Sequence, residues 1–86
     1  MTKYFVYVLC NFERFYVGFT TNINRRLKEH GKAKLSHRNK NFSPVLIEIF
    51  FNKTDAKRRE NYLKSFKGRA TLKAMLRETL KEKEPS

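Results

Sequence analysis

The stretch that decides the fold lies near the start of the chain and reads Tyr4-Phe5-Val6-Tyr7-Val8-Leu9-Cys10, then Asn11-Phe12-Glu13-Arg14, then Phe15-Tyr16-Val17-Gly18-Phe19-Thr20. Two runs rich in β-branched and aromatic residues flank a short polar break, which predicts a strand, a turn and a strand. Because side chains alternate along a strand, an even loop places Tyr7 and Tyr16 on one sheet face, whereas an odd loop or a bulge parts them. With Gly18 leaving open space beside them, the two phenols can form the floor of a site.

Length and charge narrow the class of protein. The chain has 86 residues, which predicts one domain over residues 1–80 and a frayed tail over 81–86. The formal net charge of +12 implies a polyanionic partner, nucleic acid first and an anionic membrane surface second. Cys10 is the single cysteine, which fits a reducing compartment. The first apolar run is too short to span a membrane, so we expect a soluble, cytoplasmic protein with no membrane partner and no small-molecule cofactor.

The rest of the chain predicts one more strand and three helices. Together with the hairpin they make an α+β sandwich, in which a three-stranded antiparallel sheet is flanked by helices in the order strand, strand, helix, strand, helix, helix. The further elements are a helix capped by Thr21 or Asn22 and ended by Gly31, a central strand over Pro44–Phe51, a helix capped by Thr54 and ended by Gly68, and a helix from about Arg69.

Glu60 is the most informative single residue. It falls between Ala56 and Leu63 on the apolar stripe of its helix, where a charge needs a partner or a metal. In the structural interpretation it pairs with a nearby Lys or Arg. In the functional interpretation it binds Mg²⁺ or Mn²⁺, since such cations are commonly held by one or two carboxylates together with water and substrate phosphate.

Arg26 and His30 lie one turn apart on the helix that follows the hairpin. A guanidinium binds phosphate through two hydrogen bonds, and an imidazole can move a proton near neutral pH. Taken alone, the pair also fits a solvated basic helix face. Tyr7 and Tyr16 likewise fit ordinary strand packing when each is considered by itself.

Two basic segments are candidate nucleic-acid surfaces. Isolated basic loops are usually just solvated, but the overall charge favours phosphate contacts here. The first segment contributes Lys32, Lys34, His37, Arg38 and Lys40, and the second, around the helix that carries Glu60, contributes Lys57, Arg59, Lys64, Lys67 and Arg69.

The order and spacing of these residues resemble the GIY-YIG nuclease family over about Lys3 to Met75. The first family motif is matched by Phe5-Val6-Tyr7 and the second by Tyr16-Val17-Gly18. The Arg that precedes a His by four residues is matched by Arg26 and His30, and the metal glutamate by Glu60. The chain is most similar to small stand-alone bacterial members, and also resembles the nuclease module at the start of the excision-repair endonuclease.

The resemblance implies a metal-dependent endonuclease that hydrolyses DNA, with RNA as a further substrate and repair or processing of branched DNA as the setting. In family terms Glu60 would hold Mg²⁺ or Mn²⁺, and Arg26 would neutralise charge on the phosphate. Tyr7 would be the base, with Tyr16 and His30 shaping its proton affinity and Gly18 admitting the substrate. Two alternatives stay open at this point, a non-catalytic nucleic-acid-binding module with a degenerate site and an RNA-associated accessory protein. The sequence leaves the oligomeric state open.

Overall fold

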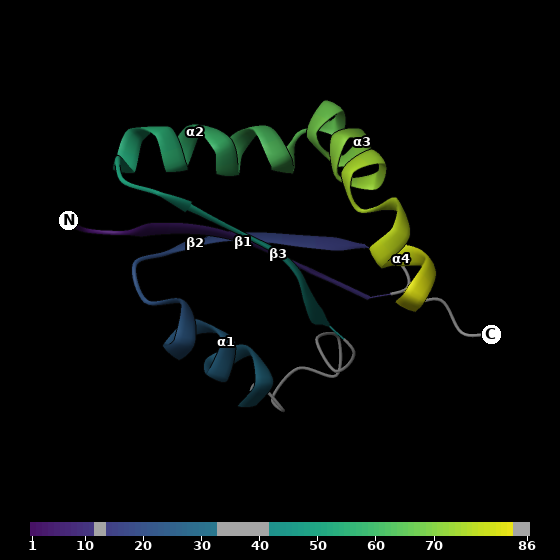
Figure 1. Ribbon diagram of the computed structural model, residues 1–86, viewed down its shortest axis with the longest axis horizontal. Coiled ribbons are helices and arrows are strands. Elements are labelled where there is room, and N and C mark those ends of the chain that lie inside the picture. Colours follow the sequence, from purple (N-terminus) through teal and green to yellow (C-terminus); the bar gives the residue numbers. More distant parts are fainter. Residues whose placement is uncertain (12–13, 33–41, 84–86) are drawn as a thin grey trace.

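A computed structural model describes residues 1–11, 14–32 and 42–83 of the chain. A three-stranded sheet lies between α1 on one side and α2 with α3 on the other (Figure 1), as the predicted α+β class requires. The elements are β1 (Tyr4–Cys10), β2 (Phe15–Thr20), α1 (Ile23–Lys32), β3 (Ser43–Phe50), α2 (Lys53–Lys64), α3 (Phe66–Met75) and α4 (Arg77–Lys83). In the described residues no helix has the length and apolar character needed to cross a membrane.

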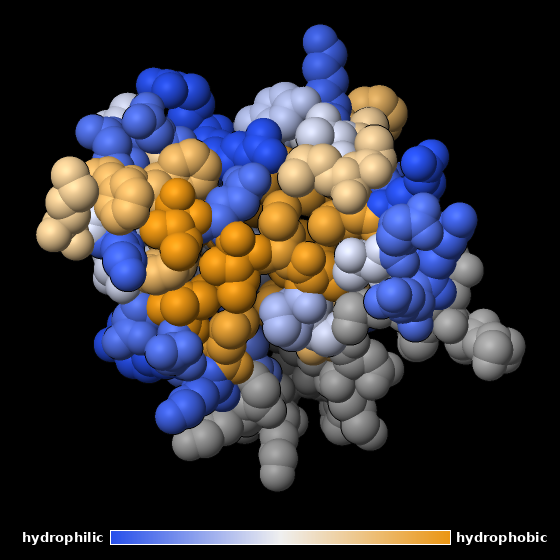
Figure 2. Space-filling model, viewed as in Figure 1, coloured by the Kyte–Doolittle hydropathy of each residue, from blue (hydrophilic) through white to orange (hydrophobic). Residues whose placement is uncertain are grey.

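The sheet is antiparallel and has the order β2-β1-β3. The prediction of a central third strand is therefore wrong, because β1 pairs with both neighbours and β3 lies at an edge. The apolar run of β3 resembles a central strand, yet Ile47 and Ile49 are 43% and 50% exposed. An apolar area bordered by hydrophilic side chains is visible where β3 crosses the view (Figure 2). Pro44 is tolerated near the start of β3 because an edge strand can spare a donor.

The predicted helix boundaries need three corrections. Helix α1 continues through Gly31 instead of ending there. Helix α2 is capped by Asn52, not Thr54, because the Asn52 side chain accepts a hydrogen bond from the Asp55 backbone N–H at 3.1 Å. It ends at Lys64, and Ser65 caps both the end of α2 and the start of α3.

Gly68 lies inside α3, where it allows a close approach between two helices. A Cβ at this position would overlap the Tyr62 carbonyl group of α2. The helix predicted from Arg69 is two helices, α3 and α4, with Leu76 at the break. Helix α4 reaches Lys83, three residues into the tail predicted to fray; residues 84–86 lie outside the described part.

The hydrophobic core lies on one face of the sheet. Apolar side chains of β1 and β2 pack there against α2, α3 and Leu76, and every member of this cluster is at most 7% exposed: Val6, Val8, Val17, Ala56, Leu63, Leu72 and Leu76. Burying these residues supplies the main stabilisation of so small a domain. The opposite face of β1 and β2 carries Tyr7 and lies under α1.

Candidate active site

The hairpin places both tyrosines of the predicted site on one face. Tyr7 lies directly opposite Gly18, and Leu9 lies opposite Tyr16, so Tyr7 and Tyr16 are diagonal neighbours. Their ring centroids are 6.3 Å apart. The even-loop prediction is confirmed. Tyr7 is 1% exposed and Tyr16 is 41% exposed, which makes Tyr7 the buried member and Tyr16 the one that meets solvent.

The space beside Gly18 is filled by Tyr7 itself. A Cβ at residue 18 would overlap Cζ and Oη of the Tyr7 phenol and would lie 2.8 Å from its Cε1. The expectation that Gly18 leaves room for the substrate is therefore wrong. The glycine instead lets the Tyr7 hydroxyl lie against the backbone of β2, because any side chain there would push the phenol aside.

Gly18→Ala is expected to destabilise the domain and to slow cleavage. Overpacking of this kind typically costs about 1–3 kcal/mol, and moving the phenol breaks its contact with His30. Urea unfolding measures the first effect and single-turnover cleavage the second. A Gly18→Ala variant with unchanged stability and rate would contradict this role of the glycine.

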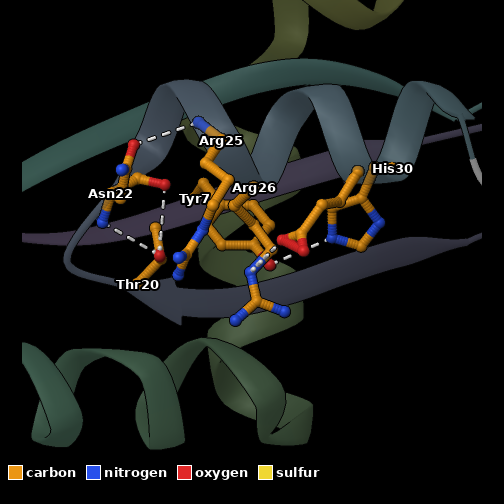
Figure 3. A network of polar contacts seen from close by, with 7 residues as sticks. Tyr7, Thr20, Asn22, Arg25, Arg26 and His30 are labelled. Carbon is orange, nitrogen blue, oxygen red and sulfur yellow. Dashed lines mark hydrogen bonds and ion pairs between the residues drawn. The ribbon is translucent and has the colours of Figure 1, made fainter.

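A local turn sets the start of α1 and so aims its side chains. The Thr20 hydroxyl accepts a hydrogen bond from the Asn22 backbone N–H at 3.0 Å, and the Asn22 side chain accepts one from the Arg25 N–H at 3.0 Å (Figure 3). With the helix begun at Ile23, Arg26 and His30 lie one turn apart. Figure 3 shows both side chains next to Tyr7 under α1. Asn22, one of the two predicted caps, is the one observed.

His30 and Tyr7 form a hydrogen-bonded pair. The Tyr7 hydroxyl is 3.1 Å from Nε2 of His30, and the Tyr16 ring lies edge-on to the imidazole at 5.1 Å between centroids. Burial, together with the charge of Arg26, lowers the pKa of His30 below 6.5. His30 is therefore neutral at neutral pH, and in the tautomer protonated at Nδ1 its Nε2 accepts the phenolic proton.

The phenol of Tyr7 is a weaker acid than an ordinary tyrosine. Burial and then the neighbouring Tyr16 raise its pKa to about 12, and they outweigh the lowering by Arg26. The expectation that Arg26 brings Tyr7 toward phenolate is thus not met by the protein residues alone. At neutral pH Tyr7 is a phenol, held beside an imidazole that can receive its proton.

Arg26 offers a donor that the described residues do not use. Its Nε is shielded from solvent and has no hydrogen-bond partner within the described part of the chain. The nearest carboxylate oxygen, of Glu29, is 3.9 Å away, which makes an ion pair between partly exposed side chains. A buried unsatisfied donor is costly, and an anionic oxygen bound next to Tyr7 would satisfy it.

Glu60 is nearly buried and fully paired. Its side chain is 8% exposed, with Oε1 3.1 Å from the Lys57 ammonium and Oε2 2.9 Å from that of Lys64. Burial raises the pKa of Glu60, but the hydrogen bonds from Lys64 and Lys57 outweigh it and the net shift is downward. The structural interpretation of Glu60 is therefore realised. Helical spacing is the signal for both partners, since Lys57 precedes Glu60 by three residues and Lys64 follows it by four.

The same carboxylate also fits a divalent cation. It is ionised, it supplies oxygen ligands, and its charge acts on Tyr7 by raising the pKa of the phenol. Among the described residues no three His, Cys, Asp or Glu side chains gather as a metal cluster. A single carboxylate completed by water and substrate phosphate is the usual way to hold Mg²⁺.

The predicted phosphate contacts divide into those described and those not. Helix α1 ends at Lys32, and the predicted basic surface from Lys32 to Lys40, with Lys34, His37 and Arg38, lies outside the described side chains. On α2, Arg59 binds Glu48 of β3 through two hydrogen bonds of 2.8 and 3.1 Å, a partner that sequence reasoning missed. Lys67 is exposed, as is Arg69, at the start of α3.

Comparisons with known proteins agree with this arrangement. The family model of the GIY-YIG catalytic domain matches residues 3–73. A UPF0213 protein of Staphylococcus haemolyticus is 35% identical over 77 residues, covering 85% of this chain and 94% of the relative. A UPF0213 protein of Clostridium perfringens is 33% identical over 82 residues, covering 91% and 88%. The solution NMR structure of the UPF0213 protein from Bacillus halodurans has a TM-score of 0.55 and 30% identity, covering 85% of this chain and 84% of that one.

Proposed function

This chain belongs to the GIY-YIG family of nucleases, and from that premise we propose that it is a divalent-metal-dependent endonuclease. It hydrolyses phosphodiester bonds in DNA, in the repair or processing of branched DNA. The observation that carries the proposal is the Tyr7 hydroxyl, which lies 3.1 Å from the His30 Nε2 and within electrostatic reach of both Arg26 and Glu60. A proton acceptor, a phosphate-binding cation and a metal-binding carboxylate thus act on one phenol.

Each side chain has a separate task in this proposal. Glu60 holds Mg²⁺ or Mn²⁺, which when bound polarises the phosphoryl oxygen and stabilises the leaving oxygen. Arg26 donates to the scissile phosphate through the Nε that has no protein partner in the described residues and neutralises the charge that develops there. The exposed Tyr16 orients water beside Tyr7.

Proton transfer runs through the Tyr7–His30 pair. A phenol whose pKa is raised to about 12 is a poor base at neutral pH, but it can pass its own proton to His30 as it takes one from the attacking water. His30 is suited to receive it because burial and Arg26 keep the imidazole neutral. Tyr7 thus contacts the water, and His30 is the final acceptor.

One observation favours a second candidate function. Lys57 and Lys64 already occupy both oxygens of Glu60, an arrangement that also suits a non-catalytic nucleic-acid-binding module. Such a module would use exposed basic residues such as Lys67 and Arg69 for phosphate and would not need a metal. Chelation separates the two functions, because simple phosphate binding survives it.

The test incubates the protein with flapped, branched, single-stranded and double-stranded DNA and with RNA, with Mn²⁺ or with EDTA. We expect cleavage of at least one DNA substrate that requires Mn²⁺, and binding in EDTA that weakens steeply with salt, by about 0.7–0.9 in log–log slope for each phosphate contact. Salt-sensitive binding without any cleavage would select the non-catalytic module. Binding that is indifferent to salt would contradict both functions.

A further inference from the structure

The carboxylate of Glu60 is held by two ammonium groups, one from each side along α2. The distances are 3.1 Å from Lys57 Nζ to Oε1 and 2.9 Å from Lys64 Nζ to Oε2. Each oxygen of the carboxylate therefore has its own cationic partner. With one negative and two positive charges, this cluster has a formal charge of +1, which opposes the approach of a divalent cation.

The two lysines are placed to hold the carboxylate and also to let it go. Their side chains are 48% and 52% exposed, whereas that of Glu60 is 8% exposed. The Lys57 ammonium additionally lies over the ring of Phe19, 4.6 Å from its centroid, which fixes its direction. A lysine side chain is flexible and can turn its ammonium to another anion, while Glu60 stays in place.

We propose that Lys57 and Lys64 are a cationic latch on the metal ligand. This inference rests on the proposed role of Glu60 and adds a control to it. In the free protein the two ammonium groups compete with the divalent cation for Glu60, so metal binds weakly. A nucleic-acid phosphate that reaches α2 takes over the ammonium groups, frees the carboxylate, and so couples metal binding to substrate binding.

The first experiment measures Mn²⁺ affinity by the paramagnetic broadening of amide signals around residue 60 in ¹⁵N-labelled protein without nucleic acid. The latch variant Lys57→Met/Lys64→Met keeps the side-chain stems and removes both charges. The control variant Lys53→Met/Lys73→Met makes the same change in formal charge at two exposed lysines that are not among the ion-pair partners of Glu60. The same spectra report whether each variant is folded, and the two single variants replace the latch variant if it unfolds.

We expect the latch variant to bind Mn²⁺ at least about tenfold more tightly than the parent, since two adjacent like charges are removed. The control should change the Kd less than about threefold because salt screens distant charges. Adding Glu60→Gln should abolish the gain. Equal affinities for parent and latch variant, both lost with Glu60→Gln, would overturn the latch and leave the metal role intact. Binding indifferent to Glu60→Gln in every variant would overturn the metal role and the latch together.

A second experiment follows the release step in the parent protein. The ¹⁵Nζ signals of Lys57 and Lys64 and the carboxyl carbon signal of Glu60 report on their ion pairs. Adding a short DNA duplex in EDTA should shift all three signals together, as the lysines leave the carboxylate. If DNA binds and these signals stay in place, the phosphate does not open the latch.

Discussion

Glu60→Gln is expected to reduce single-turnover cleavage roughly a thousandfold or more, with little loss of fold stability. Glutamine keeps the shape of the side chain but loses the charge that would hold the cation. A bound metal contributes several kcal/mol to transition-state stabilisation, and each 1.36 kcal/mol is worth a factor of about ten in rate. The measurement uses saturating protein and Mn²⁺ on the DNA substrate that is cut fastest. Unchanged cleavage would contradict the assignment of Glu60 as metal ligand.

The stability of this variant needs separate treatment because Glu60 is paired. Its pKa in the folded protein lies below the usual value of 4.5, so the carboxylate stabilises the fold at neutral pH. That contribution is complete above about pH 4.5 and disappears as the pH falls through the lower, folded pKa. Glu60→Gln should therefore cost about 1 kcal/mol at pH 7, and less in acid. The lysines can turn to solvent, which keeps the loss small.

Tyr7→Phe is expected to lower cleavage by roughly 10²–10⁴-fold, the usual contribution of general acid–base catalysis. The substitution removes the hydroxyl that lies 3.1 Å from His30 Nε2 and leaves the ring in place. Tyr16→Phe should slow cleavage less, because Tyr16 orients water and does not lie in the proton path. The double variant should be little worse than Tyr7→Phe, since residues that act as a unit are not additive.

Two controls distinguish this chemistry from lost packing. Tyr62→Phe removes a hydroxyl that contacts the Thr71 Oγ1 at 2.7 Å, so it should cost about 1 kcal/mol of stability as well without slowing cleavage. In the parent protein the rate should fall as the pH drops through the pKa of His30, which lies below 6.5. That acidic limb should be absent in Tyr7→Phe. Full activity in both tyrosine variants would leave His30 as the base.

Much of this protein follows from local sequence pattern. Alternation along the hairpin and an even loop put Tyr7 and Tyr16 on one face, and four-residue helical spacing put Arg26 beside His30. These relations depend on backbone geometry within one element or one turn, which neighbouring residues determine. The α+β class and the charged position of Glu60 on its stripe follow in the same way.

Tertiary structure decided what the side chains meet. The order β2-β1-β3 depends on which face each helix covers, so the apolar run of β3 did not place it at the centre. The Tyr7 phenol occupies the space at Gly18, and its burial raises its pKa instead of lowering it. The bond between Tyr7 and His30 joins residues from different elements, 23 positions apart. Contacts and desolvation of this kind arise only when the elements pack, because they depend on distances through space and not on spacing along the chain.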